Sequence, residues 1–261
     1  MNVLIASSSY AIKRHRHAFS NWLSFWLTGT AAQEIDDWPL PRDIDQWTWT
    51  DYESYLFEHL SAFNGDLAAR VQSLYAKRGT PELVFTSLVS DLHETCPVSA
   101  VAMMLDHYWR QPVYRYVVNF TTADTNSGSD AGDVDVMQHR GESVRASFRY
   151  SYHSIDMYHF FSSTGAVPSS GQLAYHSNIK DDDVVAGTSQ QQQQHEQFRD
   201  VMRQTVFEFA RTGRLEGWLS YPRTKLLSSQ IADVQSNNSY RHEQCELWRA
   251  NAMFPDYAWM N

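Results

Sequence analysis

Cysteine is scarce in this sequence, with two in 261 residues and no Cys-x-x-Cys pair, so neither a zinc ribbon nor a thioredoxin-type redox site is expected. Long apolar runs are also absent. The longest uncharged candidate, residues 18–32, is interrupted by Ser, Asn and Thr and is shorter than the ~20 residues of a membrane span. Positive charge is in deficit, because 21 Lys and Arg face 30 Asp and Glu, a net charge of −9. Without a basic stripe, there is no electrostatic case for binding nucleic acid.

The histidines show no metal-binding pattern. None of the 11 forms a His-x-x-x-His or Glu-x-x-His spacing with nearby ligands, so we predict no metal and no cofactor. Apolar and aromatic residues are plentiful, at 43% and 14%, which indicates a folded globular core and excludes disorder as the default state. We predict a single unit over residues 1–261 with long loops near 121–146 and 162–194.

The first half of the chain alternates one strand pattern with several helical ones. Residues 3–12 predict a short strand with a Ser-rich exit. A basic cluster at 13–17 and an aromatic run at 19–27 resemble a secretory signal. A strand precedes them, however, so a helix or loop is favoured there. Helical spacing covers 48–75, broken near Asp66, a candidate N-cap, and resumes over 82–92, with Pro97 beginning the next helix.

The second half contains the clearest strand, 113–120 (VYRYVVNF), whose alternating β-branched and aromatic residues are typical of a sheet. Residues 160–169 look like a loop. A glutamine tract at 187–194 is predicted to be a linker into a helix over 195–211, with Phe198, Met202, Val206, Phe207 and Phe209 on its apolar stripe. Thr212-Gly213 ends that helix, and a last short helix is predicted over 242–252. One clear strand among at least five helices predicts an α/β class with too few strands to be self-contained.

Five segments, in order, resemble the C-terminal part of the type-B carboxylesterase and cholinesterase family of α/β hydrolases. They are DLHETCPVSAVA at 91–102, YRYVVNF at 114–120, YHSIDMYHFF at 152–161, FARTG followed by WLSYPRT within 198–224, and HEQCELW at 242–248. The resemblance implies the C-terminal half of an α/β-hydrolase sheet with covering helices, its N-terminal half absent. Residues 3–10 should then pair parallel beside 113–120.

The resemblance also assigns the candidate catalytic residue. His153 matches the family's catalytic histidine, which lies on an exposed loop beyond the carboxyl ends of the last strands. Asp156 matches a nearby acidic position and is expected to support that loop by hydrogen bonding. His159 lies where the family has no titratable group, so we expect it on the surface.

Cys96 and Cys245 match a pair that is disulfide-bonded in secreted family members, which implies a secreted or lumenal protein, although the chain carries no convincing signal. The alternative is two free thiols in a reducing compartment. Two glycosylation sequons occur. Asn119 ends a strand and is expected to be too buried for a glycan, so Asn237 is the favoured site.

Several parts of a serine esterase are missing. The sequence has no Gly-x-Ser-x-Gly and no run of glycines for an oxyanion hole. In the family, a strand near residue 1 would end in the glutamate that orients the histidine, but residues 6–11 contain no carboxylate. Glu34, Asp36 and Asp37 lie about two dozen residues further on and could substitute only if the loop folds back. We therefore expect the triad acid to be absent.

Two functional hypotheses follow. The first is the C-terminal portion of a serine ester hydrolase, which would bind an ester substrate only when completed by an N-terminal half and would be inactive alone. The second is a segment of a non-catalytic, cholinesterase-like adhesion protein, with a homodimer or adhesion partner contacting its C-terminal helices. The missing acid favours the second hypothesis. The isolated chain is expected to hydrolyse an aryl ester no faster than free imidazole, and to associate through exposed apolar surface.

Overall fold

The computed structural model describes residues 4–6, 25–35, 40–109, 111–120, 151, 153–161, 189–228, 231–233 and 239–253. These form a mixed α/β fold around one sheet of five strands in the order β1-β2-β3-β4-β5. The strands are β1 (Leu4–Ala6), β2 (Trp26–Ala31), β3 (Val113–Val118), β4 (Lys225–Leu227) and β5 (Ile231–Asp233). β1 to β4 are parallel, and β5 joins as an antiparallel edge.

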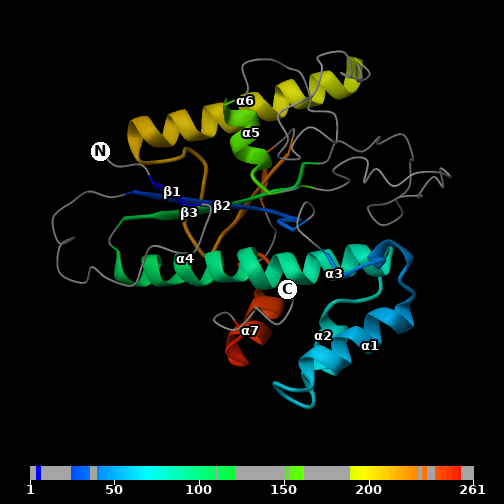
Figure 1. The fold of residues 1–261 in the computed structure, drawn as a ribbon. Coiled ribbons are helices and arrows are strands. Elements are labelled where there is room, and N and C mark those ends of the chain that lie inside the picture. Colours follow the sequence, from blue (N-terminus) through cyan, green and yellow to red (C-terminus); the bar gives the residue numbers. More distant parts are fainter. Residues whose placement is uncertain are drawn as a thin grey trace, which may run out of the picture.

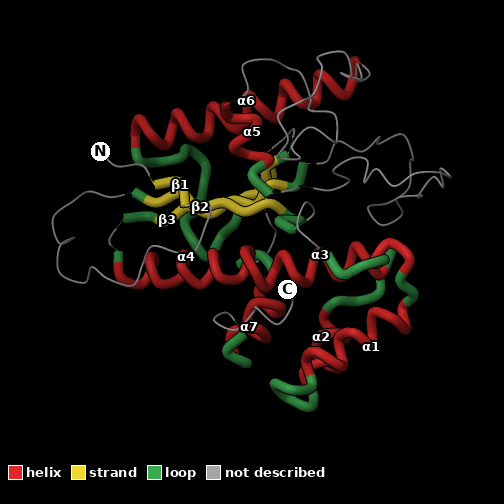
Figure 2. Tube along the Cα trace, viewed as in Figure 1, coloured by secondary structure: helices red, strands yellow, loops and turns green. Residues whose placement is uncertain are grey.

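Helices cover both faces of the sheet, as Figure 1 shows. On one face lie α5 (Ile155–Phe161) and α6 (Ser189–Thr212). On the other lie α3 (Pro81–Ser90) and α4 (Cys96–Tyr108), which a π-helical turn, η2 (Asp91–Thr95), joins into nearly one rod. Beyond that rod lie α1 (Trp49–Leu60), α2 (Leu67–Leu74) and α7 (His242–Ala250), and a short 3-10 turn, η1 (Ile44–Gln46), precedes α1. The arrangement of helix, sheet and helix layers is also clear in Figure 2.

The alternation of side chains along β2 and β3 builds the core on each face. Residues of β2 and β3 pair in register, with Leu27 opposite Tyr114 and Gly29 opposite Tyr116. Tyr114, Tyr116 and Val118 therefore point to the α5/α6 face, where they pack with Phe198, Met202 and Phe209 of α6. The intervening residues point to α4, and among them Arg115 is buried, with its guanidinium donating to the Thr95 carbonyl at 3.0 Å.

The predicted helices of the first half are confirmed, with local signals that explain their ends. Thr48 and Asp51 form a reciprocal capping box at the start of α1, and Thr80 caps α3 ahead of Pro81. Asp66 occupies the N-cap of α2, although its side chain makes no capping hydrogen bond. α4 begins at Cys96 with Pro97 in its first turn, as predicted.

The strand order differs from the prediction in one respect. β1 lies in the same sheet as β3 and is parallel to the other strands, but β2 intervenes between them. The sequence reading expected a helix or loop over 19–27 and did not predict the strand at 26–31. The aromatic residues of 19–27 favoured the prediction of a helix or loop. In the structure, Leu27, Gly29 and Ala31 alternate along β2 with two buried threonines, which is a strand pattern. Residues 19–24 lie outside the described part of the chain.

Three further expectations need correction. The glutamine residues from 190 onward are the first turns of α6 rather than a linker. Residues 160 and 161 end α5 and do not form a loop. Phe207 is 64% exposed, because the buried stripe of α6 follows Phe198, Met202, Val206 and Phe209. The expected loop near 121–146 lies outside the described residues, as do residues 162–188 of the loop expected near 162–194, whereas residues 189–194 belong to α6.

A disulfide joins Cys96 to Cys245, as predicted, with their Cα atoms 5.0 Å apart. It ties α7 to the start of α4, and a buried polar chain reinforces the same contact. The Trp248 indole donates to the Tyr75 hydroxyl at 3.0 Å, and that hydroxyl donates to Asp91 at 2.9 Å. Arg241, just before α7, lies 3.5 Å from the same Asp91 carboxylate. Among the described residues no helix is long and apolar enough to cross a membrane.

Candidate functional site

The candidate site lies where β2 and β3 end side by side. The chain leaves β2 at Ala31 and makes a turn over residues 32–35, which we call the acid turn. The Ala32 amide donates to the Val118 carbonyl at 2.9 Å, so the acid turn begins against the end of β3. Ser151 joins the two, because its hydroxyl donates to Val118 at 2.8 Å and its carbonyl accepts from Gln33 at 2.9 Å. The carboxyl ends of parallel strands are where α/β proteins commonly place their sites.

The central contact of the site is a hydrogen bond between His153 and Glu34. Nδ1 of His153 lies 2.7 Å from one carboxylate oxygen of Glu34, and the other oxygen accepts from the Ala31 amide at the end of β2. Glu34 is 6% exposed, and the His153 side chain is 35% exposed. A buried carboxylate thus holds Nδ1 of a half-buried imidazole, which fixes the tautomer that carries its proton on Nδ1.

Burial and partners act on the Glu34 carboxyl in opposite directions. Desolvation raises its pKa above the ordinary value, and this effect outweighs the hydrogen bonds from His153 and Ala31 that lower it. The nearby Asp156 carboxylate raises the pKa of Glu34 further. The site therefore concentrates negative charge around one imidazole.

The expectation that no carboxylate stands beside His153 is wrong, because Glu34 binds its Nδ1. The family resemblance predicts the acid after β1, at residues 6–11, whereas Glu34 follows β2. The sequence does hold a signal, since a six-residue strand at 26–31 is followed three residues later by a glutamate. This signal depends on residues 26–31 being a strand, which the sequence analysis did not predict. Asp36 and Asp37 lie outside the described residues.

His153 itself lies in a short turn immediately before α5. The next residue, Ser154, has a φ of 63°, in the left-handed region, and this sharp bend directs the chain into the helix. The Ser154 carbonyl accepts from the Tyr158 amide at 2.9 Å in the first turn of α5. The position of the imidazole therefore depends on where α5 begins.

Asp156 anchors α5 to the sheet beneath it. One carboxylate oxygen accepts from the Tyr116 hydroxyl of β3 at 2.7 Å, and the other accepts from the Met157 amide at 2.8 Å. Tyr116 is buried, and desolvation raises the pKa of its phenol well above the ordinary value, so it remains a hydrogen-bond donor. The contact holds the beginning of α5, and with it His153, against the central strand.

His159 was expected on the surface, and this is wrong. Its side chain is 4% exposed between α5 and α6, with the ring 5.2 Å from the His195 ring in a stacked pair. Both histidines also contact Phe120, which stacks on Phe198 with ring centroids 4.5 Å apart. Desolvation lowers the pKa of His159 to about 3, and it is therefore neutral near pH 7.

The sequon at Asn119 was dismissed as too buried, yet Asn119 is exposed at the end of β3. The preferred sequon, Asn237, lies outside the described residues. Among the residues described, no cluster of three or more potential metal ligands occurs.

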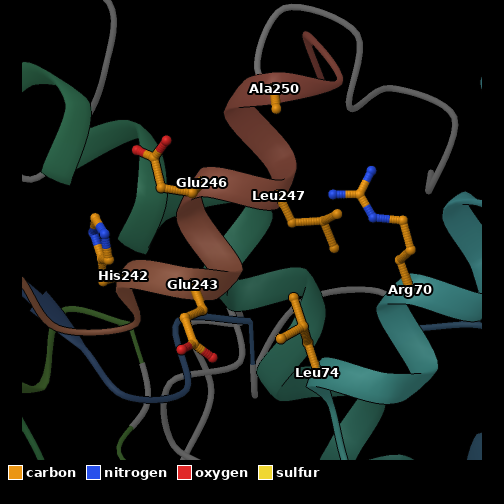
Figure 3. A pocket seen from close by; sticks show the side chains of 7 residues that line it. All are labelled: Arg70, Leu74, His242, Glu243, Glu246, Leu247 and Ala250. Atoms are coloured by element: carbon orange, nitrogen blue, oxygen red, sulfur yellow. The ribbon is translucent and has the colours of Figure 1, made fainter.

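A separate hollow of 410 Å³ lies between α2 and α7, away from the sheet (Figure 3). Figure 3 shows Leu74 and Leu247 facing one another across it, with charged side chains around them. Its lining residues are Arg70, Leu74, His242, Glu243, Glu246, Leu247 and Ala250. None of these is a serine, cysteine or threonine, so the lining offers no hydroxyl or thiol nucleophile of those three kinds.

Comparison with known proteins adds no relative. A scan against family models finds no match to the chain, and a search of curated proteins finds no match to its sequence.

Proposed function

We propose that this chain supplies the acid and base of a serine ester hydrolase related to the type-B carboxylesterases and cholinesterases. The single observation that carries the proposal is the 2.7 Å hydrogen bond between Nδ1 of His153 and the buried Glu34 carboxylate. In a Ser-His-acid triad, the acid binds Nδ1 and fixes the tautomer, while Nε2 accepts the proton of the serine hydroxyl. Glu34 and His153 have the chemistry for these two roles.

The local sequence resemblance supports the same assignment. The segment around His153 resembles the part of the family that bears its catalytic histidine, and this resemblance identified His153 independently of its contact with Glu34. Glu34 follows a parallel strand beside β3, which is the kind of position the family gives its acid. Asp156 matches the family's second acidic position and binds Tyr116.

The remaining machinery must come from residues outside this sequence. No Gly-x-Ser-x-Gly and no glycine run occurs among the 261 residues, so we propose that the nucleophile and the oxyanion donors are supplied by a further segment or partner chain. The complete enzyme would form an acyl-serine on a carboxylic ester and release it to water, with His153 as base and then as acid. The disulfide and the absence of a membrane-spanning helix among the described residues are compatible with a secreted or lumenal protein.

The adhesion hypothesis was favoured by the expected absence of a triad acid. Because Glu34 binds His153, that observation no longer favours it.

The test is made on the protein that the cell produces. The complete native transcript is sequenced and expressed, and hydrolysis of an aryl ester and labelling by a serine-directed phosphonate are measured. We expect a Gly-x-Ser-x-Gly in the transcript, labelling, and at least a 10³-fold loss of turnover in His153→Ala and a lesser but large loss in Glu34→Gln, on the order of triad losses elsewhere.

The matched control is His107→Ala, which removes an exposed histidine of α4 and should leave turnover unchanged. A complete transcript without a nucleophile motif, in a protein that neither labels nor hydrolyses esters, would overturn the proposal and return the adhesion hypothesis. Full activity in His153→Ala would also overturn it.

A further inference from the structure

One side of the α3–η2 rod faces the acid turn. Ser87 accepts a hydrogen bond from the Gln33 side chain at 2.6 Å, and the Ser90 hydroxyl accepts from the Ile35 amide at 3.2 Å. The residues of the acid turn on either side of Glu34 are therefore fixed to the rod. Glu94 follows Ser90 by four residues, which is close to one turn of the π-helical η2, so it lies on nearly the same side of the rod as Ser90.

Glu94 therefore lies on the side of the rod that faces the acid turn. It is half-buried, whereas Leu92, His93 and Thr95 beside it are buried, so its side chain is the part of the turn that meets solvent at the site. Insertions of this kind are frequent at functional positions of helices.

The charges of the site act on Glu94 in both directions. Burial raises the pKa of its carboxyl group to about 7, the Glu34 carboxylate raises it as well, and His153 lowers it. Glu94 therefore interacts with both members of the pair, and it changes charge near neutral pH.

We propose that Glu94 is a positioning residue of this site, whose carboxyl group sets the charge that His153 carries by acting on the Glu34–His153 pair. The assignment of a catalytic purpose to that effect rests on the proposed function. An ionised Glu94 favours the imidazolium form of His153, and a neutral Glu94 does not. Because the charges of Glu94 and His153 act on each other, protonation of one changes the proton affinity of the other, and the two titrate as a coupled system.

Other ionisable groups of β3 and η2 do not change charge near pH 7 as Glu94 does. Burial lowers the pKa of Arg115 to about 10, so this guanidinium on β3 stays charged near pH 7, and the Tyr116 phenol stays neutral. Burial lowers the pKa of His93 in η2 to about 4, so it is neutral there. The groups whose charges interact with the pair are Arg115 and Tyr116 of β3, Glu94 of η2 and Asp156 of α5.

The experiment measures the titration of the His153 imidazole by ¹H–¹³C NMR in the 261-residue chain, with the resonance assigned from His153→Ala. In Glu94→Gln we expect the midpoint of His153 to fall by about 0.5 to 1 pH unit, since a nearby anion is removed. The control is Glu58→Gln, the same change of charge at an exposed site on α1, which should leave the midpoint unchanged.

An equal His153 midpoint in the wild type, Glu94→Gln and Glu58→Gln would overturn the proposal. Should Glu94→Gln not fold, the wild-type curve decides: coupling predicts a His153 titration that departs from a single-site curve, and a single-site curve contradicts the proposal. This readout requires no nucleophile, so it can fail while the ester hydrolase assay succeeds, or the reverse. In the complete enzyme, Glu94→Gln should move the acidic limb of the pH–rate profile to lower pH.

Discussion

Ser154 is the residue on which the position of His153 most directly depends. Its φ of 63° is favourable for glycine and strained for residues with a β-carbon, especially a branched one. The serine retains the bend at a cost in backbone strain on the order of 1 kcal/mol.

Substitution at Ser154 should show that the bend is required. Ser154→Gly should change the free energy of unfolding by less than about 1 kcal/mol, because relief of strain offsets the greater freedom of the unfolded chain. Ser154→Val should destabilise by about 1 to 2 kcal/mol and weaken the contact of His153 with Glu34. Urea denaturation measures the first effect, and the Nδ1 proton of His153 in NMR spectra reports the second. A valine variant as stable as the glycine variant would contradict this.

Gly29 is the second backbone position that the site requires. A β-carbon there would lie 2.0 Å from the ring of Tyr116, the residue that binds Asp156. Gly29→Ala should therefore cost about 1 to 3 kcal/mol through overpacking and loosen the beginning of α5. The control is Gly65→Ala, where nothing lies within 4 Å of the added carbon. Urea denaturation of both variants checks this, and equal stability would mean that Tyr116 moves aside without cost.

At the scale of elements, the α5–α6 contact contains two buried, stacked histidines, His159 and His195. Desolvation lowers the pKa of His159 to about 3 in the folded state, against about 6.5 in an unfolded chain. Between these values the unfolded state binds a proton that the folded state does not. Stability contributed by the neutral ring is therefore complete above pH 6.5 and is lost as the pH falls.

Because of the buried His159, we expect the free energy of unfolding to decrease as the pH falls. The free energy of unfolding should fall below pH 6.5 by up to about 1.4 kcal/mol per pH unit from His159 alone. His159→Phe, which keeps an aromatic ring beside Phe120 and Phe198, should reduce that slope, whereas the exposed His107→Ala should not. Urea denaturation at a series of pH values between 7.5 and 4.5 gives the slopes. An unchanged slope in His159→Phe would show that other groups dominate.

Elements with strong local signals were predictable from the sequence. Helices α1 to α4 have caps, prolines and apolar spacing at their ends, and β3 alternates clearly, so their bounds differ from prediction by only a few residues. β2 lacks a clear strand pattern in part because it carries Gly29, which must be small where the ring of Tyr116 from the neighbouring strand lies against it. That reason is tertiary, and a single segment does not display it.

The sequence predicts the local part of the site but not the contact that depends on strand order. His153 and the cysteine pair lie in segments whose order along the chain resembles a family. The partner of His153 depends on which strands are neighbours, so missing β2 also misplaced the acid. Glu94 has no sequence signal of its own, since its role depends on the two serine contacts that fix the acid turn to the rod.

At the scale of the whole molecule, the Cys96–Cys245 bridge joins residues 149 positions apart. In the chain-entropy account, a closed loop of this length contributes at most about 5 kcal/mol to stability. Replacing both cysteines by serine should lower the free energy of unfolding by up to that amount and loosen α7 first. Urea denaturation, compared with reduced wild-type protein, measures the loss. A change below about 1 kcal/mol would mean that the buried chain of Trp248, Tyr75 and Asp91 holds α7 without the bridge.

The same bridge has a consequence for proteolytic processing. The covalent loop that it closes includes His153, whereas Glu34 lies outside it. A single cleavage anywhere between residues 96 and 153 would place the two members of the pair on separate polypeptides, yet leave them in one molecule. Such a cleaved protein would migrate as one band until reducing agent is added, and it could retain the pair intact. Maturation by cutting is therefore compatible with this site.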